Sequence, residues 1–296
     1  MRKLIASAAM LVALSAAGAA QAQQAAGQPF KAEGWKYGTR NDATGPAAVW
    51  NPAKKKLMDG GDLIGGTIRG TDPRIYCAMA TAGYDFTWTE KQHEAIDWEQ
   101  AARMWRTCPR GAGVAVPGVR VAYTDEREIQ HALDTGAMVL VVPTVDTVEE
   151  AREVVSWAYY PPMGRRSSGG GQGPSEMWAD VPGGYRQTFN DNLVLVLMIE
   201  TLEGVENARE IAKVPGVSAI FAASGDLGNF SGYKEGDPEY ERLVTEIHDA
   251  AVAAGVKLCG PLRWRDRPGY TCFQGSGEAA VIKAGVAAEL KPTTTN

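Results

Sequence analysis

The sequence predicts a closed (β/α)8 barrel, the TIM-barrel fold, on three observations. Short apolar runs alternate with longer amphipathic segments through most of the 296-residue chain, which is typical of βαβ units. Eight such steps are present, the number that closes a parallel barrel. No GxGxxG motif follows the first run, and this argues against the alternative of an open, doubly wound dinucleotide-binding sheet.

The predicted strands are apolar runs bounded by turn residues. A run without polar alternation indicates a strand buried on both faces. In chain order the strands are Leu63–Ile68, Tyr84–Thr89, Gly113–Pro117, Met138–Val142, Leu193–Ile199, Val217–Ala222, Val256–Gly260 and Tyr270–Gln274.

The predicted helices lie between these strands and carry start and stop signals. Asp72 and Pro73 suit the N-cap and first position of a helix, and Asp125 and Gly136 mark the start and stop of another. After the helix that starts at Asp72, we expect Ala95–Thr107, Asp125–Thr135, Val148–Tyr159, Val205–Lys213, Pro238–Gly255 and Glu278–Leu290. The Gly- and Pro-rich stretch 161–174 is expected to form an irregular loop near the active site.

The N-terminus has the pattern of a secretory signal. Met1-Arg2-Lys3 is basic, an Ala-rich apolar segment follows to about Ala20, and Ala20-Gln21-Ala22 matches a cleavage site. A membrane anchor is the weaker alternative, because the segment lacks the ~20 strongly apolar residues of a spanning helix. We therefore expect a signal peptide at 1–22, a loosely ordered leader at 23–56 and one catalytic domain at 57–296. The mature protein is expected to be exported, to the periplasm of a Gram-negative bacterium, without membrane attachment.

Composition limits the partners and the redox chemistry. A net charge of −5 and a pI near 5.4 argue against a nucleic-acid partner. An even cysteine count in an exported chain permits disulfides. Cys259 with Cys272, on neighbouring predicted strands, and Cys77 with Cys108 are the candidate pairs, and buried free thiols are the alternative.

Two acidic residues come directly after apolar runs. Glu200 follows the run 193–199, and Asp226 follows the run 217–225. In an α/β barrel the carboxyl ends of the strands face the active site, and oxygen ligands there suit Mg²⁺ or Mn²⁺ with water completing the shell. The sequence therefore predicts a divalent-metal site at Glu200 and Asp226, with simple solvation of strand ends as the alternative.

Three further polar residues are expected at the same rim. His93 follows the second strand and has a side chain suited to proton transfer near neutral pH. Glu90 is expected to orient its imidazole. Arg120 follows the third strand, where a guanidinium can bind a carboxylate or stabilise an enolate oxygen.

These residues occur in motifs that resemble the HpcH/HpaI aldolase and citrate lyase family, on its class II pyruvate-aldolase side. The resemblance covers about Leu63 to Leu290. The motifs are Ala82–Phe86, Val119-Arg120, Tyr160–Arg166, Met198–Thr201 and Ser224–Leu227.

The resemblance implies a pyruvate-domain-like barrel that cleaves a 4-hydroxy-2-oxo acid into pyruvate, or an analogue, and an aldehyde. It implies that Glu200 and Asp226 hold Mg²⁺ or Mn²⁺, with Co²⁺ as a further candidate. It also implies that Arg120 supports the enolate oxygen and that His93 belongs to the acid–base machinery. Ser224, Gly225 and Asp226 would meet the substrate carboxylate. Such enzymes are usually hexamers that pack or exchange their last helix.

The chain departs from the family pattern in three places. The family's Asp-x-Glu-His is Glu90-Lys91-Gln92-His93 here, and Val121 replaces the common proline. The segment 261–269 is too short for the usual helix and holds three arginines. We expect these changes to alter substrate choice rather than to abolish activity.

Three alternatives stay open. A Schiff-base mechanism would need a lysine, and Lys257 is the best candidate. A divergent lyase for an aromatic substrate is a second alternative, because Trp88, Trp178 and Tyr185 are candidates to line the mouth. A non-catalytic exported protein that binds oxo acids is the third.

Overall fold

Eight parallel strands close into a barrel in chain order, from β1 to β8 and back to β1. The computed structural model describes residues 49–108, 111–161, 163–169 and 185–291. The predicted signal peptide, most of the predicted leader and residues 170–174 of the Gly-rich loop lie outside these residues. The strands are β1 (Leu63–Ile68), β2 (Phe86–Glu90), β3 (Val116–Arg120), β4 (Val139–Val142), β5 (Val194–Ile199), β6 (Ala219–Ala222), β7 (Lys257–Pro261) and β8 (Tyr270–Gly277).

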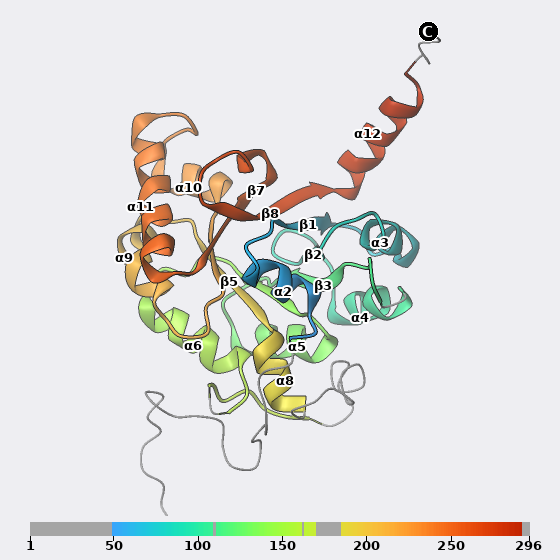
Figure 1. Cartoon of the computed structure of the whole chain (residues 1–296), viewed down its shortest axis with the longest axis horizontal. Coiled ribbons are helices and arrows are strands. Elements are labelled where there is room, and N and C mark those ends of the chain that lie inside the picture. Colours follow the sequence, from blue (N-terminus) through green and yellow to red (C-terminus); the bar gives the residue numbers. More distant parts are fainter. Residues whose placement is uncertain (1–48, 109–110, 162, 170–184, 292–296) are drawn as a thin grey trace, which may run out of the picture. The chain divides into compact units, whose positions relative to one another are not determined.

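Helices connect most of the strands and lie around the outside of the barrel, except for α12 at the C-terminal end (Figure 1). They are α2 (Pro52–Met58), α3 (Pro73–Ala80), α4 (Trp98–Thr107), α5 (Glu126–Thr135), α6 (Val148–Ala158), α8 (Tyr185–Asn192), α9 (Leu202–Ala212), α10 (Ser224–Ser231), α11 (Pro238–Ala254) and α12 (Glu278–Glu289). The expected caps are confirmed, since Asp72 accepts from two backbone N–H groups of α3 and Asp125 does the same at α5. The chain therefore has the predicted TIM-barrel fold.

The structure differs from the prediction in the start of β3 and in two additional helices. β3 begins at Val116, after a turn in which Gly111 and Gly113 have positive φ angles. Helices α8 and α10 were not expected. The segment after β7 holds only a 3₁₀ turn, η2 (Leu262–Trp264), as the short spacing predicted.

Part of the predicted leader is ordered. Pro52 lies at the start of α2, and Asn51 caps this helix through a bond to the N–H of Ala53. Asn51 is buried and its amide donates to the carbonyl of Asn192 at 2.8 Å. The folded domain therefore begins before residue 57.

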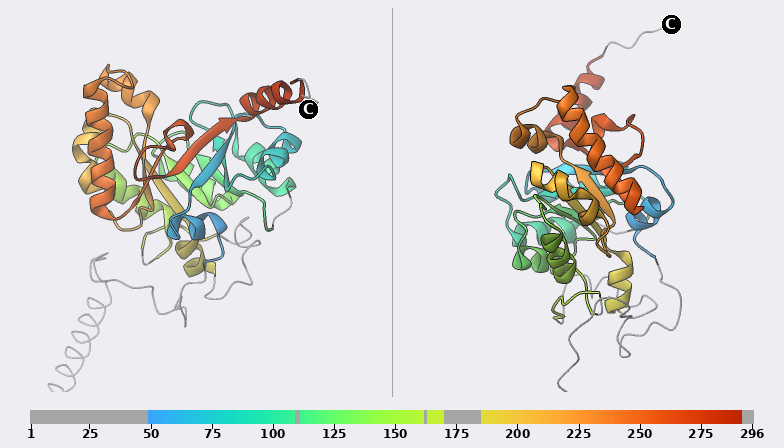
Figure 2. Two further views of the ribbon diagram at one scale, coloured as in Figure 1. Left: turned by 45° about the horizontal axis from the view of Figure 1, so that its top comes forward. Right: turned by 90° about the vertical axis from the view of Figure 1, so that its left-hand side faces the viewer.

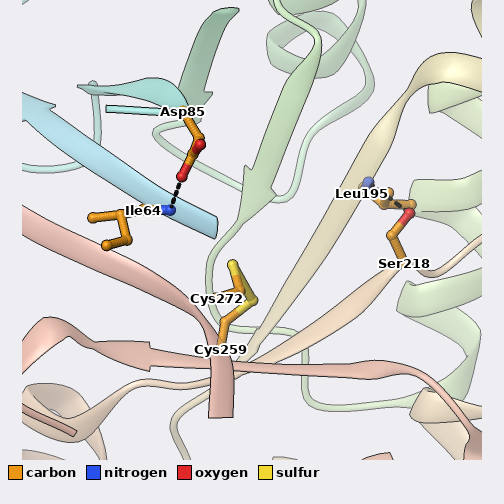
Figure 3. The surroundings of a disulfide bond; sticks show 6 residues. All are labelled: Ile64, Asp85, Leu195, Ser218, Cys259 and Cys272. Atoms are coloured by element: carbon orange, nitrogen blue, oxygen red, sulfur yellow. Dashed lines mark hydrogen bonds between the residues drawn. A yellow bond between two sulfur atoms is a disulfide. The ribbon is translucent and has the colours of Figure 1, made fainter. Parts of the chain in front are cut away.

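The barrel core is mainly apolar, as the continuous runs predicted. The β4 and β5 side chains are all buried, and most show no exposure at all. Cys259 and Cys272, paired in register on β7 and β8, form a disulfide with a Cα–Cα distance of 4.2 Å. Figure 3 shows this bridge between the two strands. Cys77 and Cys108 are free thiols.

The last helix is the least buried element of the domain. None of its residues is buried, and it projects from the end of β8 away from the barrel (Figures 1 and 2). Ile282, Val286 and Leu290 are exposed on it and after it. No described helix has both the length and the apolar character needed to cross a bilayer.

Candidate active site

The carboxyl ends of β2, β3, β5 and β6 bring the predicted polar residues to one rim of the barrel. Glu90 and Arg120 are the last residues of β2 and β3. Glu200 directly follows β5, and Asp226 lies in the first turn of α10, which follows β6. Strand ends of a parallel barrel converge in this way because every strand runs in the same direction.

Glu90 and Arg120 form a buried ion pair. They are register partners on neighbouring strands. Arg120 Nε lies 3.0 Å from Oε1 and 2.9 Å from Oε2 of Glu90, and Nη2 lies 2.5 Å from Oε2. Arg120 is 6% exposed and Glu90 is fully buried. This pairing of a guanidinium with a carboxylate holds the arginine in one orientation.

An aromatic ring supports the same pair. The indole Nε1 of Trp88 donates to Glu90 Oε2 at 3.3 Å, and the Arg120 guanidinium lies 5.9 Å from the centre of the Trp88 ring. Trp88 is itself buried inside the barrel. Trp88 therefore supports the ion pair from within the barrel and does not line the entrance of the active site, as the aromatic alternative required.

Glu90 also organises the loop that carries His93. Its Oε1 accepts from the backbone N–H of Gln92 at 2.9 Å and of His93 at 3.4 Å. The predicted bond to the His93 imidazole is not among those of the described residues. His93 is exposed just past the end of β2.

Glu200 is held by a residue that sequence reasoning missed. Its Oε1 accepts from both the backbone N–H and the Oγ1 of Thr144, each at 2.7 Å. Thr144 has a φ angle of 48°, the sole positive φ of a non-glycine residue in the described part of the chain. That conformation is strained for a β-branched residue. In the sequence, the one feature that could have pointed to Thr144 is its place after Pro143, directly past the end of β4.

The other oxygen of Glu200 is unsatisfied. Oε2 is buried and has no hydrogen-bond partner among the described residues. Burial raises the pKa of the Glu200 carboxyl, and the negative charge of Asp226 raises it further, against the opposing effects of the Thr144 bonds and Arg120. A buried carboxylate oxygen without a partner, next to a second carboxylate, fits a divalent cation.

Few side chains at this place could bind a metal ion. No cluster of three or more His, Cys, Asp and Glu ligands occurs in the described residues. A cation here would therefore rest on Glu200 and Asp226, with oxygens of water or substrate completing its shell. This pattern suits Mg²⁺, which keeps several non-protein ligands.

The start of α10 offers an anion site beside these carboxylates. Ala223 caps this helix without a side-chain bond, so its first N–H groups point outward. Ser224 and Gly225 open the helix, and Tyr240 fixes the loop by donating its hydroxyl to the Ser224 carbonyl at 2.9 Å. A helix N-terminus of this kind can bind a carboxylate. Ser224, Gly225 and Asp226, the expected carboxylate-binding residues, thus form the first turn of this helix.

Other candidates lie elsewhere. Lys257 is the first residue of β7, at the amino end of the barrel and therefore opposite the carboxylates. His131 and His248 lie in α5 and α11, as expected. Tyr185 begins α8, which leads into the amino end of β5, and Trp178 lies outside the described residues.

Comparisons with known proteins show the family to which the chain belongs. The family model for HpcH/HpaI aldolase/citrate lyase matches residues 68–272. A 2-keto-3-deoxy-L-rhamnonate aldolase of Klebsiella pneumoniae subsp. pneumoniae is 32% identical over 221 residues, which are 73% of this chain and 82% of the relative.

Two solved structures share the fold. An HpcH/HpaI aldolase/citrate lyase family protein from Burkholderia cenocepacia J2315 is 25% identical, with a TM-score of 0.71 over 81% of this chain and 98% of its own. The citrate synthase SbnG is 26% identical, with a TM-score of 0.67 over 80% of this chain and 95% of its own.

Proposed function

The chain belongs to the HpcH/HpaI aldolase/citrate lyase family, a family of carbon–carbon lyases, and we propose that it cleaves a 4-hydroxy-2-oxo acid into pyruvate, or a close analogue, and an aldehyde. The observation that carries this proposal is the unsatisfied Glu200 Oε2 beside Asp226, on the same rim as the Glu90–Arg120 pair. This rim combines a cation site with a fixed guanidinium.

Cleavage of a carbon–carbon bond next to a ketone leaves negative charge on the former keto oxygen. Glu200 and Asp226 would hold Mg²⁺ or Mn²⁺, with Co²⁺ as a further candidate, and the bound cation would supply Lewis-acid stabilisation of that charge. Arg120, kept in place by Glu90, donates N–H groups to the same developing charge. Such preorganised donors stabilise the transition state without reorganisation.

The substrate carboxylate and the departing aldehyde have their own partners. The free N–H groups at Ser224, Gly225 and Asp226 receive the carboxylate of the oxo acid. His93, exposed on the rim, removes the proton from the 4-hydroxyl group, directly or through a water molecule. No Schiff-base lysine enters the reaction, in keeping with the distant position of Lys257.

The experiment is a pyruvate-release assay on a panel of 4-hydroxy-2-oxo acids, run first in EDTA and then with Mg²⁺, Mn²⁺ or Co²⁺. Release that depends on added metal supports the proposal. Absence of release with every metal, from protein shown to be folded, would favour the non-catalytic oxo-acid-binding alternative. Cleavage restricted to aromatic members of the panel would favour the divergent aromatic lyase.

We further propose that the mature enzyme is exported to the periplasm and is a hexamer. The N-terminal signal pattern supports export. The apolar and exposed Ile282, Val286 and Leu290 support self-association through α12. Light scattering on the purified protein, with Ile282→Glu as a disrupting variant, tests the assembly, and cell fractionation tests the location.

A further inference from the structure

Two thiols that the proposed reaction does not use lie together on the outside of the barrel. Cys77 is in the middle of α3, and Cys108 is the C-cap residue of α4. These two helices pack against each other beside the barrel (Figure 1). The fold thus brings together two cysteines that are 31 positions apart in the sequence.

The two cysteines are in direct contact. Cys108 Sγ donates to the carbonyl oxygen of Cys77 at 4.0 Å, and the Cys77 side chain is a further hydrogen-bond partner of the Cys108 thiol. The same carbonyl accepts from the backbone N–H of Thr81 at 3.0 Å and from its Oγ1 at 2.7 Å, so its position is fixed. The two sulfur atoms therefore already lie close to each other, as a disulfide requires.

The two thiols differ in their access to solvent. Cys108 is 5% exposed, whereas Cys77 is half-buried. Burial and the hydrogen bond with Cys77 raise the pKa of the Cys108 thiol to about 12. Because the thiolate is the nucleophile in thiol–disulfide exchange, Cys77 is the thiol that reacts first with a dissolved disulfide.

From this arrangement we infer that Cys77 and Cys108 are a modification site, which a disulfide oxidant converts into a second disulfide within the chain. The bond ties α3 to the end of α4. It closes a loop that contains β2, with Glu90 at its end, and the segment that carries His93. The inference does not depend on the proposed aldol cleavage.

The oxidation proceeds in two exchange steps. The Cys77 sulfur attacks the oxidant, whose S–S bond breaks, and one thiol leaves with the proton that Cys77 loses. The Cys108 sulfur then attacks the Cys77 sulfur of this mixed disulfide, and the second thiol leaves with the Cys108 proton. In sum, two cysteine thiols are oxidised and one disulfide oxidant is reduced to two thiols, with no further reactant.

The test is a thiol count on the purified full protein before and after incubation with oxidised glutathione. The chain has four cysteines, and the Cys259–Cys272 bond already holds two of them. We expect the count in the acid-quenched, denatured protein to fall to zero. Mass spectrometry without reduction should then find the tryptic peptides 75–91 and 107–110 joined.

The melting temperature provides a second measurement. A bond across this loop restricts the unfolded chain, and it should raise the melting temperature by about 5–10 °C. The double variant Cys77→Ala/Cys108→Ala is the matched control, because it retains the Cys259–Cys272 bond. Its mass and melting temperature should not change on incubation with oxidised glutathione.

Single variants test the order of the two steps. Cys108→Ala should keep one glutathione on Cys77, because the thiol that resolves the mixed disulfide is absent. Cys77→Ala should take up none, because Cys108 is buried. Neither variant should gain in melting temperature, and Cys77→Ala, a change at a half-buried position, gives this result even if Cys108→Ala does not fold.

Three results would overturn the inference. One is a wild-type protein that keeps two thiols after incubation. Another is a wild-type protein that stops at a glutathione adduct on Cys77 with Cys108 still reduced. The third is a joined peptide that links Cys77 or Cys108 to Cys259 or Cys272, which would show exchange between bonds instead of a built pair.

Discussion

Glu90 Oε2 and Arg120 Nη2 lie 2.5 Å apart at the ends of neighbouring strands, in the most deeply buried ion pair of the described residues. A buried pair of this kind does not by itself stabilise a protein, because the desolvation of two charges offsets their attraction. Its effect is to hold one guanidinium in a fixed orientation at the rim of the barrel.

Glu90→Gln should therefore lower both the stability of the fold and the rate of the reaction. The substitution leaves Arg120 charged, buried and without its partner, and we expect a loss of about 3–5 kcal/mol in the free energy of unfolding by urea. Glu126→Gln is the matched control. It breaks the surface pair with Arg165, which should cost less than about 1 kcal/mol. Equal losses in the two variants would contradict this assignment.

Thr144 should control metal affinity without touching the metal. Thr144→Ala removes the Oγ1 bond that orients Glu200, and groups behind a ligand typically contribute about 10- to 100-fold in affinity. Thr144→Ser keeps the hydroxyl and should bind metal like the wild type. Thr147→Ala serves as the control, since Thr147 caps α6 instead. Calorimetric titration with Mn²⁺ measures all three, and wild-type affinity in Thr144→Ala would refute the role.

The raised pKa of Glu200 predicts how stability without metal depends on pH. The folded protein keeps this proton at pH values where the unfolded chain has lost it. The contribution of Glu200 is thus neutral below its ordinary pKa of 4.5. It becomes increasingly destabilising as pH rises from 4.5 to the raised pKa, and it is constant above that value.

Glu200→Gln should lack that dependence. In EDTA, the melting temperature of the wild type should fall relative to Glu200→Gln as pH increases above about 4.5 and then level off. Glu149→Gln, an exposed change in a surface pair, should follow the wild type. Parallel curves for wild type and Glu200→Gln would mean that burial does not disfavour the charged form.

His93 is expected to act in proton transfer and not in metal binding. His93→Ala should lower kcat by about 100-fold or more, the usual contribution of a general acid or base, while the Mn²⁺ affinity stays at the wild-type level. His131→Ala, in α5, is the control and should leave both quantities unchanged. Equal losses of turnover and metal affinity would show that His93 is structural.

The parts of the fold that local chemistry determines could be predicted. Leu63–Ile68 and the helix capped by Asp125 and Gly136 have boundaries that propensity and capping define. The start of β3 could not be placed, because pairing with β2 selects Val116 and not the preceding apolar residues. Helix α10 was missed because two glycines weaken its local helix signal.

The residues of the candidate site also divide into those that the sequence reveals and those that only the fold reveals. Glu200 and Asp226 could be predicted to lie at the strand ends, because an acidic residue after an apolar run is visible in the sequence. Thr144 could not be predicted, because its role depends on a φ of 48° and on a contact with a residue 56 positions away. The partner of Glu90 likewise follows from strand register, which the sequence alone does not display.

The most direct test of the central claim is the exchange of the pyruvate methyl hydrogens with D₂O, followed by proton NMR. This reaction requires formation of the enolate but no aldehyde, so it is independent of the unknown partner. The account predicts exchange with Mg²⁺ or Mn²⁺ that EDTA abolishes and that Glu200→Gln loses. Folded, metal-saturated wild-type protein that leaves the methyl signal unchanged would contradict it.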